Sequence, residues 1–319
     1  MTVLKLLLNI WKAGNETFIR RFRLIGDRTF IPEKIVILKI SKPDKMRLKL
    51  FLLLAFVPAL VCTAKPEGLS GITVMSYNIR SGEASDGTNS WQFRFPATAM
   101  MIEDQKPDIL GIQEAMQYQL LFITENCRDY KYAGAGSEDG KSKGEHTAIL
   151  YNKKTTSLLK WGTFWLSDTP DKPSKGWDAS AARTATWALM KNKKTGKKFY
   201  FINVHLDGEG DTARLKGLGL VMSRIVELNS DRLPVILAGC FNAGVPALVS
   251  LEGMKNARQI AARTDSNATF NGWGKSSSVI DHIFYSGFRS CTDFETVVKP
   301  YADRKFISDH YPVKAVLVF

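Results

Sequence analysis

Each of the four histidines in this chain lies within two residues of a carboxylate, at the end of an apolar run. They occur in Glu145-His146, His205-Leu206-Asp207, Asp281-His282 and Asp309-His310. Histidine beside a carboxylate suits proton transfer, phosphate binding and the support of metal ligands near neutral pH. Because an ordinary structural domain scatters its few histidines, this grouping predicts one chemical site.

A second set of polar residues stands where apolar, strand-like segments end. These segments end in Asn78, Glu114, His205 with Asp207, Asn242, Asp281, and Asp309 with His310. Since strand ends on one side of a sheet converge, we expect these side chains to line one crevice. Carboxylate and amide oxygens suit Mg²⁺ and neutral donors suit a phosphate, so the pattern predicts a metal and phosphate site.

Alternating strand-like and helix-like segments predict an α/β domain whose sheet is covered by helices. Runs rich in Val, Ile, Tyr, Phe and Trp predict strands over residues 72–78, 108–113, 147–151, 184–190, 199–205, 235–238, 279–285 and 313–319. Helical spacing of apolar residues predicts a helix over 212–229, with Asp211-Thr212 as its N-cap. The remaining expected elements are shorter helices over 97–104 and 118–127 and polar loops over 134–144 and 166–182.

The first 64 residues differ in composition from the rest of the chain. A basic start at Met46 is followed by an apolar run over residues 50–61 and by Thr63-Ala64, the layout of a secretory signal peptide cut after Ala64. The run is shorter than the roughly 20 residues of a bilayer span, which favours a cleaved signal over an anchor. We therefore expect an over-long start at 1–45, a signal at 46–64, and one exported domain at 65–319, periplasmic or extracellular. Lipid attachment at Cys62 is an alternative.

Charge and cysteine content limit the function further. The chain has 44 basic and 31 acidic residues, but 12 and 4 of these lie in the first 64, so 32 basic and 27 acidic residues remain, a net charge of +5. That charge is not by itself the mark of a nucleic-acid-binding protein. The domain keeps Cys127, Cys240 and Cys291, an odd number without metal-type spacing, so at least one thiol is free or paired between molecules.

The ordered motifs resemble those of the endonuclease/exonuclease/phosphatase superfamily of DNase I-like proteins. The stretches Thr163 to Pro170 and Arg183 to Trp187 look like its exported bacterial branch. That family has an Asn-bearing strand, Gln-Glu, Asn-x-His-Leu-Asp, Gly-Asp-Phe-Asn, Ile-Asp and Ser-Asp-His. The corresponding segments here follow the same order, at Asn78, Gln113-Glu114, Asn203 to Asp207, Gly239 to Asn242, Ile280-Asp281 and Ser308 to His310. The resemblance implies a four-layer sandwich of two packed mixed sheets flanked by helices.

The resemblance also implies a role for each site residue. One or two Mg²⁺ or Mn²⁺ ions would be held chiefly by Glu114, with Asn78 nearby and Asp309 completing the site. His205 and Asn242 would contact the scissile phosphate. His310, oriented by Asp281, would stabilise charge on the phosphate or protonate the leaving oxygen. The chain would then be a metal-dependent phosphoric-ester hydrolase that forms no covalent intermediate.

Cys240 departs from the family, which has aspartate here to orient or deprotonate the attacking water. A thiol is a weak acceptor with an ordinary pKa of about 8.5, so it cannot replace that carboxylate. Three readings follow. The chain is a non-catalytic paralogue that binds phosphate ligands, or an enzyme with slow or altered activity that uses metal-bound hydroxide or a neighbour such as Asp207, or an active parent in which the substitution is introduced or erroneous. Gly208 also stands where the family often has histidine.

The remaining expectations concern the rim of the site and the substrate. Glu145 and His146 are candidate substrate contacts, whereas His282 is expected to pack beneath the site. A phosphate ester is the expected partner, and nucleic acid, a phospholipid headgroup and a phosphorylated sugar are all compatible with the sequence. No stable membrane span is expected in the mature chain.

Overall fold

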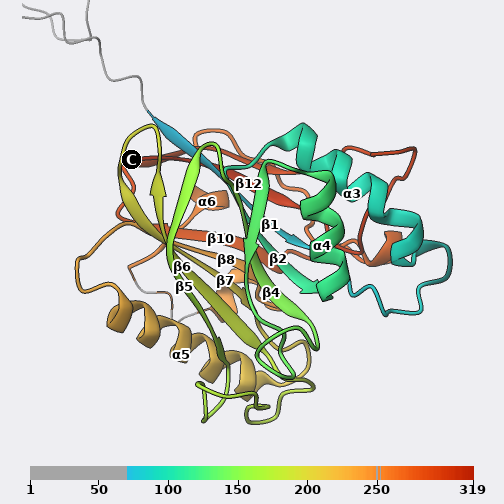
Figure 1. Cartoon of the computed structure of the whole chain (residues 1–319), viewed down its shortest axis with the longest axis horizontal. Coiled ribbons are helices and arrows are strands. Elements are labelled where there is room, and N and C mark those ends of the chain that lie inside the picture. Colours follow the sequence, from blue (N-terminus) through green and yellow to red (C-terminus); the bar gives the residue numbers. More distant parts are fainter. Residues whose placement is uncertain (1–69, 249–250, 252) are drawn as a thin grey trace, which may run out of the picture. The chain divides into compact units, whose positions relative to one another are not determined.

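Two six-stranded β-sheets pack face to face, with helices on both outer faces, in the computed structural model of the chain (Figure 1). The structure describes residues 70–248, 251 and 253–319. The expected four-layer α/β sandwich is confirmed. The leader at 1–45, the signal at 46–64 and Cys62 lie outside the described residues, so these assignments stay predictions. Within the described part, no helix has both the length and the apolar character needed to cross a membrane.

The first sheet has the strand order β11-β12-β1-β2-β4-β3. Its strands are β1 (Gly71–Asn78), β2 (Ile109–Ala115), β3 (Tyr130–Ala133), β4 (His146–Asn152), β11 (Ser290–Thr296) and β12 (Val313–Val318). Strands β1 and β2 are parallel, and Asn78 pairs with Gln113. This register brings Asn78 and Glu114 to the same edge of the sheet.

The second sheet has the strand order β5-β6-β7-β8-β10-β9. Its strands are β5 (Thr156–Trp165), β6 (Thr184–Asn192), β7 (Lys198–His205), β8 (Val235–Cys240), β9 (Lys255–Asn256) and β10 (Asp281–Ser286). Parallel pairing of β7 and β8 sets His205 beside Cys240, and antiparallel pairing of β10 with β8 sets Asp281 on the other side of Cys240. Three chemical residues therefore form one row across three strands.

Successive side chains of a strand point to opposite faces of its sheet. The apolar residues therefore form three layers, one between the two sheets and one on the outer face of each sheet. In β1, Ile72 and Val74 face the second sheet, whereas Tyr77 packs on the helix side. In β7, Phe201 lies between the sheets and Ile202 lies in the outer core. Each sheet is thus apolar on both faces, which explains why it needs a second sheet on one side and helices on the other.

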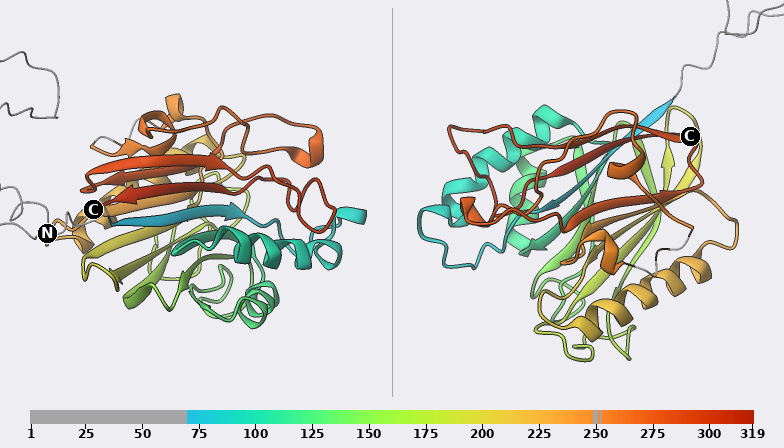
Figure 2. Two further views of the ribbon diagram at one scale, coloured as in Figure 1. Left: turned by 90° about the horizontal axis from the view of Figure 1, so that it is seen from above. Right: turned by 180° about the vertical axis from the view of Figure 1, so that it is seen from behind.

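Helices α3 (Trp91–Gln105) and α4 (Gln117–Asn126) cover the first sheet, and α5 (Asp211–Leu228) covers the second (Figure 2). Short turns of helix occur at α6 (Ala257–Ile260), η1 (Gly87–Asn89), η2 (Val245–Ala247) and η3 (Gly272–Gly274). The expected N-cap at Asp211-Thr212 is wrong, because Gly210 is the N-cap residue. The Asp178 carboxylate, from a distant loop, instead accepts hydrogen bonds from the backbone N–H groups of Thr212 and Ala213 at 3.2 and 2.7 Å.

A buried amide pair joins the two sheets just beneath the predicted crevice. Asn203 of β7 donates to the carbonyl oxygens of Ile112 and Ala148 at 2.8 and 2.7 Å, and it accepts from Gln113 at 2.7 Å. Gly111 makes room for this side chain, since a Cβ there would lie 2.7 Å from the Asn203 oxygen. The link fixes the Gln113-Glu114 segment of one sheet against the His205 end of the other.

We expect Asn203→Ala to lower the free energy of unfolding by about 2–5 kcal/mol, because two buried carbonyl groups lose their donor. Urea denaturation followed by circular dichroism measures this change. Asn126→Ala, at an exposed helix end, is the matched control and should change stability by about 0.5 kcal/mol or less. A loss below about 1 kcal/mol for Asn203→Ala would show that the link does not hold the sheets together.

Candidate active site

The side of the predicted crevice that is expected to hold a metal, here called the metal side, is built at the ends of β1 and β2. Asn78 donates through Nδ2 to Glu114 Oε1 at 2.7 Å, and the Ser81 backbone N–H donates to Glu114 Oε2 at 3.1 Å. Burial opposes ionisation of Glu114, but these hydrogen bonds and the charge of the His310 ring outweigh it and lower the pKa of Glu114. Glu114 also has a φ of 62°, in the left-handed region, which turns its carboxylate out of the strand path.

Asp309 is the second carboxylate on this side. Burial and the nearby Glu114 charge raise the pKa of Asp309, and Arg80 lies 3.7 Å from its Oδ2 atom. The half-buried Glu114 carboxylate and the buried Asp309 carboxylate, which repel each other, offer the hard oxygen donors that a divalent cation prefers. Glu114 and Asp309, with Asn78 beside Glu114, therefore fit a divalent cation.

His205 lies between the metal side and a cluster of charged residues. Its Nε2 atom is 3.8 Å from Glu114 Oε1 and 3.5 Å from Asn242 Nδ2, and its Nδ1 atom is 3.3 Å from Arg183 Nη1. Burial and the Arg183 charge lower the pKa of His205, which makes the ring neutral. Because Arg183 only donates, we assign the ring proton to Nε2, where it faces the crevice.

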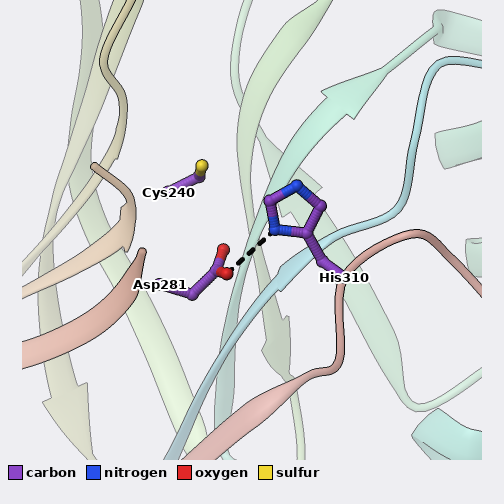
Figure 3. A group of neighbouring side chains, drawn as sticks. All are labelled: Cys240, Asp281 and His310. Atoms are coloured by element: carbon purple, nitrogen blue, oxygen red, sulfur yellow. Dashed lines mark hydrogen bonds and ion pairs between the residues drawn. The ribbon is translucent and has the colours of Figure 1, made fainter. Parts of the chain in front are cut away.

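His310 and Asp281 form a hydrogen-bonded pair beside Cys240 (Figure 3). The Nδ1 atom of His310 lies 2.9 Å from Asp281 Oδ2, and both residues are buried. Burial opposes protonation of His310, but the Asp281 carboxylate outweighs it and raises the pKa of His310 to about 9. His310 is therefore an imidazolium at neutral pH, able to donate a proton or stabilise negative charge through its other nitrogen.

Cys240 completes the row that runs through His205 and Asp281. The thiol is fully buried and free. Burial and the Asp281 charge raise the pKa of the Cys240 thiol well above its usual range. It is therefore a neutral thiol, neither a base nor an activated nucleophile.

Asp207 lies in a web of hydrogen bonds at the edge of the crevice. Its Oδ2 atom accepts from the Ser180 backbone, the Ser180 hydroxyl and Arg183 Nε at 2.8–3.0 Å. Its Oδ1 atom accepts from the backbone of Glu209 and Gly210 at 3.0 and 2.8 Å. These five donors occupy the carboxylate, so the contacts favour a positioning role for Asp207, acting through Arg183, over the proton-transfer role that one of the three readings of the sequence offered.

We expect Asp207→Asn to lower the free energy of unfolding by about 2–4 kcal/mol, since buried donors lose their acceptor. Burial opposes ionisation, but hydrogen bonds from Gly210, Ser180 and Arg183 lower the pKa of Asp207. Its stabilisation is complete above the unfolded pKa of about 3.9 and is lost as pH falls through the lower folded value. Urea titrations at several pH values measure the free energy of unfolding of the unsubstituted protein and of Asp207→Asn. The difference between these two free energies should narrow below about pH 4. Asp231→Asn, at an exposed position, should change stability little at any pH.

The rim candidates differ in accessibility. Glu145 is partly exposed and its Oε2 atom lies 3.9 Å from Arg183 Nη1. Burial and the Glu114 charge raise the pKa of Glu145 to about 7. His146 is fully buried, with Nδ1 3.1 Å from the Ala115 carbonyl oxygen, so Glu145 is better placed than His146 to touch a substrate.

His282 packs on Phe241 beneath the crevice, and its Nε2 atom lies 2.9 Å from the Ala243 carbonyl oxygen.

Fold and site together define a DNase I-like protein, and the chain belongs to the endonuclease/exonuclease/phosphatase family, whose model matches residues 75–310. A mannosyl-6-phosphatase of Bacteroides thetaiotaomicron is 38% identical, with a TM-score of 0.73 over 78% of this chain and 100% of that one. An uncharacterised mimivirus protein, L388, is 28% identical over 72% of this chain and 92% of its own length. Zebrafish TDP2 bound to a single-strand DNA product, at 15% identity and a TM-score of 0.62, shares the fold. Members of this superfamily hydrolyse phosphoester bonds and generally depend on divalent metals.

The structure adds residues to the site that the sequence did not single out. Arg183 contacts Asp207 and His205 and lies near Glu145, and Arg80 approaches Asp309. A signal for Arg183 was present in the sequence, because it directly precedes the strand-like run over residues 184–190. Only the antiparallel course of β6 makes the start of that strand meet the end of β7.

Proposed function

We propose that the protein is a metal-dependent hydrolase of phosphoric esters whose turnover is limited at position 240. The single observation that carries this proposal is the row His205, Cys240 and Asp281 across adjacent strands. In this row a thiol stands at the position to which the proposal assigns the family's water-activating carboxylate. The His310 imidazolium lies on the same side, paired with Asp281 at 2.9 Å.

Each residue has a role in this proposal. Glu114 and Asp309, with Asn78, would hold a divalent cation, which when bound offsets the charge of the phosphate. The Nε2–H of the neutral His205 ring and the amide of Asn242 are donors for phosphate oxygens. His310 donates to the leaving oxygen, and Asp281 keeps its Nδ1 atom oriented inward. The attacking water lacks a carboxylate partner, because the Cys240 thiol is neutral.

The same thiol favours a second candidate function, a phosphate-binding protein that has lost turnover. The donors of the crevice are intact, so binding does not need Cys240. Calorimetric titration with inorganic phosphate in the presence of Mg²⁺ measures this binding directly. Phosphate binding together with no detectable hydrolysis of any ester would favour the binding protein over the hydrolase.

Within the hydrolase proposal, a phosphorylated sugar is the substrate class that we favour. The support is the 38% identity to a mannosyl-6-phosphatase, whereas the likeness to the DNA-bound protein shows only the fold. The test compares hydrolysis of hexose 6-phosphates with that of an aryl phosphodiester, in Mg²⁺ or Mn²⁺, by the protein and by Cys240→Asp. Preference for the diester would contradict the sugar assignment, and inactivity of both proteins on every ester would contradict the hydrolase itself.

Export is part of the proposal, and its only support is the signal-peptide layout of residues 46–64. We propose that Met46 is the true start, that the signal is cut after Ala64, and that the domain acts in the periplasm or outside the cell. N-terminal sequencing of the secreted protein should begin at Lys65. A sequence that includes residues before Met46 would contradict the proposed start. A lipid-modified N-terminal Cys62 would show instead that the chain is processed as a lipoprotein, with cleavage before Cys62.

A further inference from the structure

Cys240, Asp281 and His310 form a compact group of potential metal ligands beside the oxygen donors of Glu114 and Asp309. One ligand atom from each of the three residues lies within 4.8 Å of the other two, and all three residues are buried (Figure 3). The three side chains come from the end of β8, the start of β10 and the loop before β12. This donor set contains sulfur and nitrogen, unlike the oxygen-rich set around Glu114.

A second, independent observation points to a ligand at this group. The Oδ1 atom of Asp281 has no hydrogen-bond partner, although the residue is only 1% exposed. Its carboxylate is directed toward the space between Cys240 and His310 (Figure 3). A buried carboxylate oxygen without a partner is unfavourable, and a cation in this space would satisfy it.

We infer that Cys240, Asp281 and His310 bind one thiophilic divalent cation of the Zn²⁺ type. Thiolate, imidazole and carboxylate are ligands that zinc accepts in tetrahedral sites, and three protein ligands leave a fourth position open. Hard ions such as Mg²⁺ prefer the oxygen donors of Glu114 and Asp309. The crevice thus contains two cation sites of different chemical character, and this inference goes beyond the proposed hydrolase.

Binding at this site is coupled to proton release. The thiol must lose its proton to become a thiolate ligand, and the ring nitrogen of His310 that ligates the ion must give up its proton. Both protons pass to solvent, so affinity rises with pH. The bound ion also occupies Asp281 and His310, the pair to which the hydrolase proposal assigns proton transfer, so Zn²⁺ should inhibit hydrolysis while Mg²⁺ supports it.

Titration of the full-length, chelator-stripped protein with Co²⁺ under a non-thiol reductant tests the site. We expect one equivalent to bind, with a near-ultraviolet thiolate-to-cobalt charge-transfer band that Zn²⁺ removes. The band should persist when Cys62, Cys127 and Cys291 are replaced by serine, singly or together, and disappear in Cys240→Ser. Asp281→Asn should weaken Co²⁺ binding by about tenfold or more while keeping the thiolate band.

The outcomes separate this inference from the proposed function, because the absorbance readout needs no turnover. Absence of the band from the unsubstituted protein, or its survival in Cys240→Ser, would overturn the inference. Loss of the band in a serine variant of another cysteine, with circular dichroism unchanged, would place the thiolate elsewhere and overturn it too. Hydrolytic activity without Co²⁺ binding would support the proposed hydrolase and contradict the second cation site.

Discussion

Cys240→Asp raises Mg²⁺-supported hydrolysis of a phosphoric ester by about 10²–10⁴-fold, the range that general acid–base catalysis contributes. The gain arises because a carboxylate at the end of β8 can accept a proton from water, whereas the buried thiol is neutral. The new carboxylate would lie beside Asp281 and His310, whose imidazolium offsets the added charge. Initial rates at saturating Mg²⁺ and a single substrate measure the gain.

Cys240→Ser is the matched control for this prediction. Serine is close in size to cysteine and adds a better acceptor, but its hydroxyl is not a base near neutral pH. Its rate should therefore stay close to that of the unsubstituted protein. Equal rates for the aspartate and serine variants, or equal rates for all three proteins, would mean that position 240 does not perform the role that the family pattern assigns to it.

Glu114→Gln, made in the Cys240→Asp background, lowers turnover by about 10²-fold or more and raises the Mg²⁺ concentration needed for half-maximal rate. Removing the carboxylate that faces Asn78 and Asp309 takes away the main negative charge that holds the cation. Since the metal supplies several kcal/mol of charge stabilisation in phosphoryl transfer, loss of about 3 kcal/mol corresponds to this factor. Mg²⁺ titrations of the initial rate measure both effects.

Glu209→Gln in the same background is the control, because Glu209 is an exposed carboxylate near the crevice. It should leave the rate and the Mg²⁺ dependence unchanged. If Glu114→Gln had the Mg²⁺ dependence of its parent, the cation would have to be held by other residues. A parallel loss in the Glu209 variant would indicate a general effect of surface charge on Mg²⁺ instead of coordination by Glu114.

The sequence predicted the inner strands of both sheets and missed the edges. All eight expected strands correspond to observed ones, and the four without a prediction, β3, β5, β9 and β11, are the edge strands of the two sheets. Inner strands are apolar on both faces, so composition alone reveals them. In β5 and β11, register shifts at Leu158/Lys160 and Cys291/Asp293 interrupt the two-residue alternation that marks a strand.

The site was partly predictable, since each motif places one polar residue at a strand end. Asn78 meets Glu114 and His205 meets Cys240 because parallel pairing brings those strand ends together. Asp281 instead arrives from the start of the antiparallel strand β10, and His310 from the loop before β12. Capping of α5 by Asp178 and the approach of Arg183 to Asp207 depend on the path of the loop over residues 166–182, which no local pattern encodes. Cysteine spacing likewise gave no metal signal, because the ligands grouped with Cys240 come from two other segments.

Diffraction from crystals of the unsubstituted protein soaked with Mn²⁺ and inorganic phosphate tests the central claim most directly, that this crevice is a metal and phosphate site. We predict an anomalous peak for Mn²⁺ on Glu114, close to Asn78 and Asp309, with the phosphate within hydrogen-bond distance of His205, Asn242 and His310. Mn²⁺ bound only on Cys240, or phosphate bound outside the crevice, would contradict the claim.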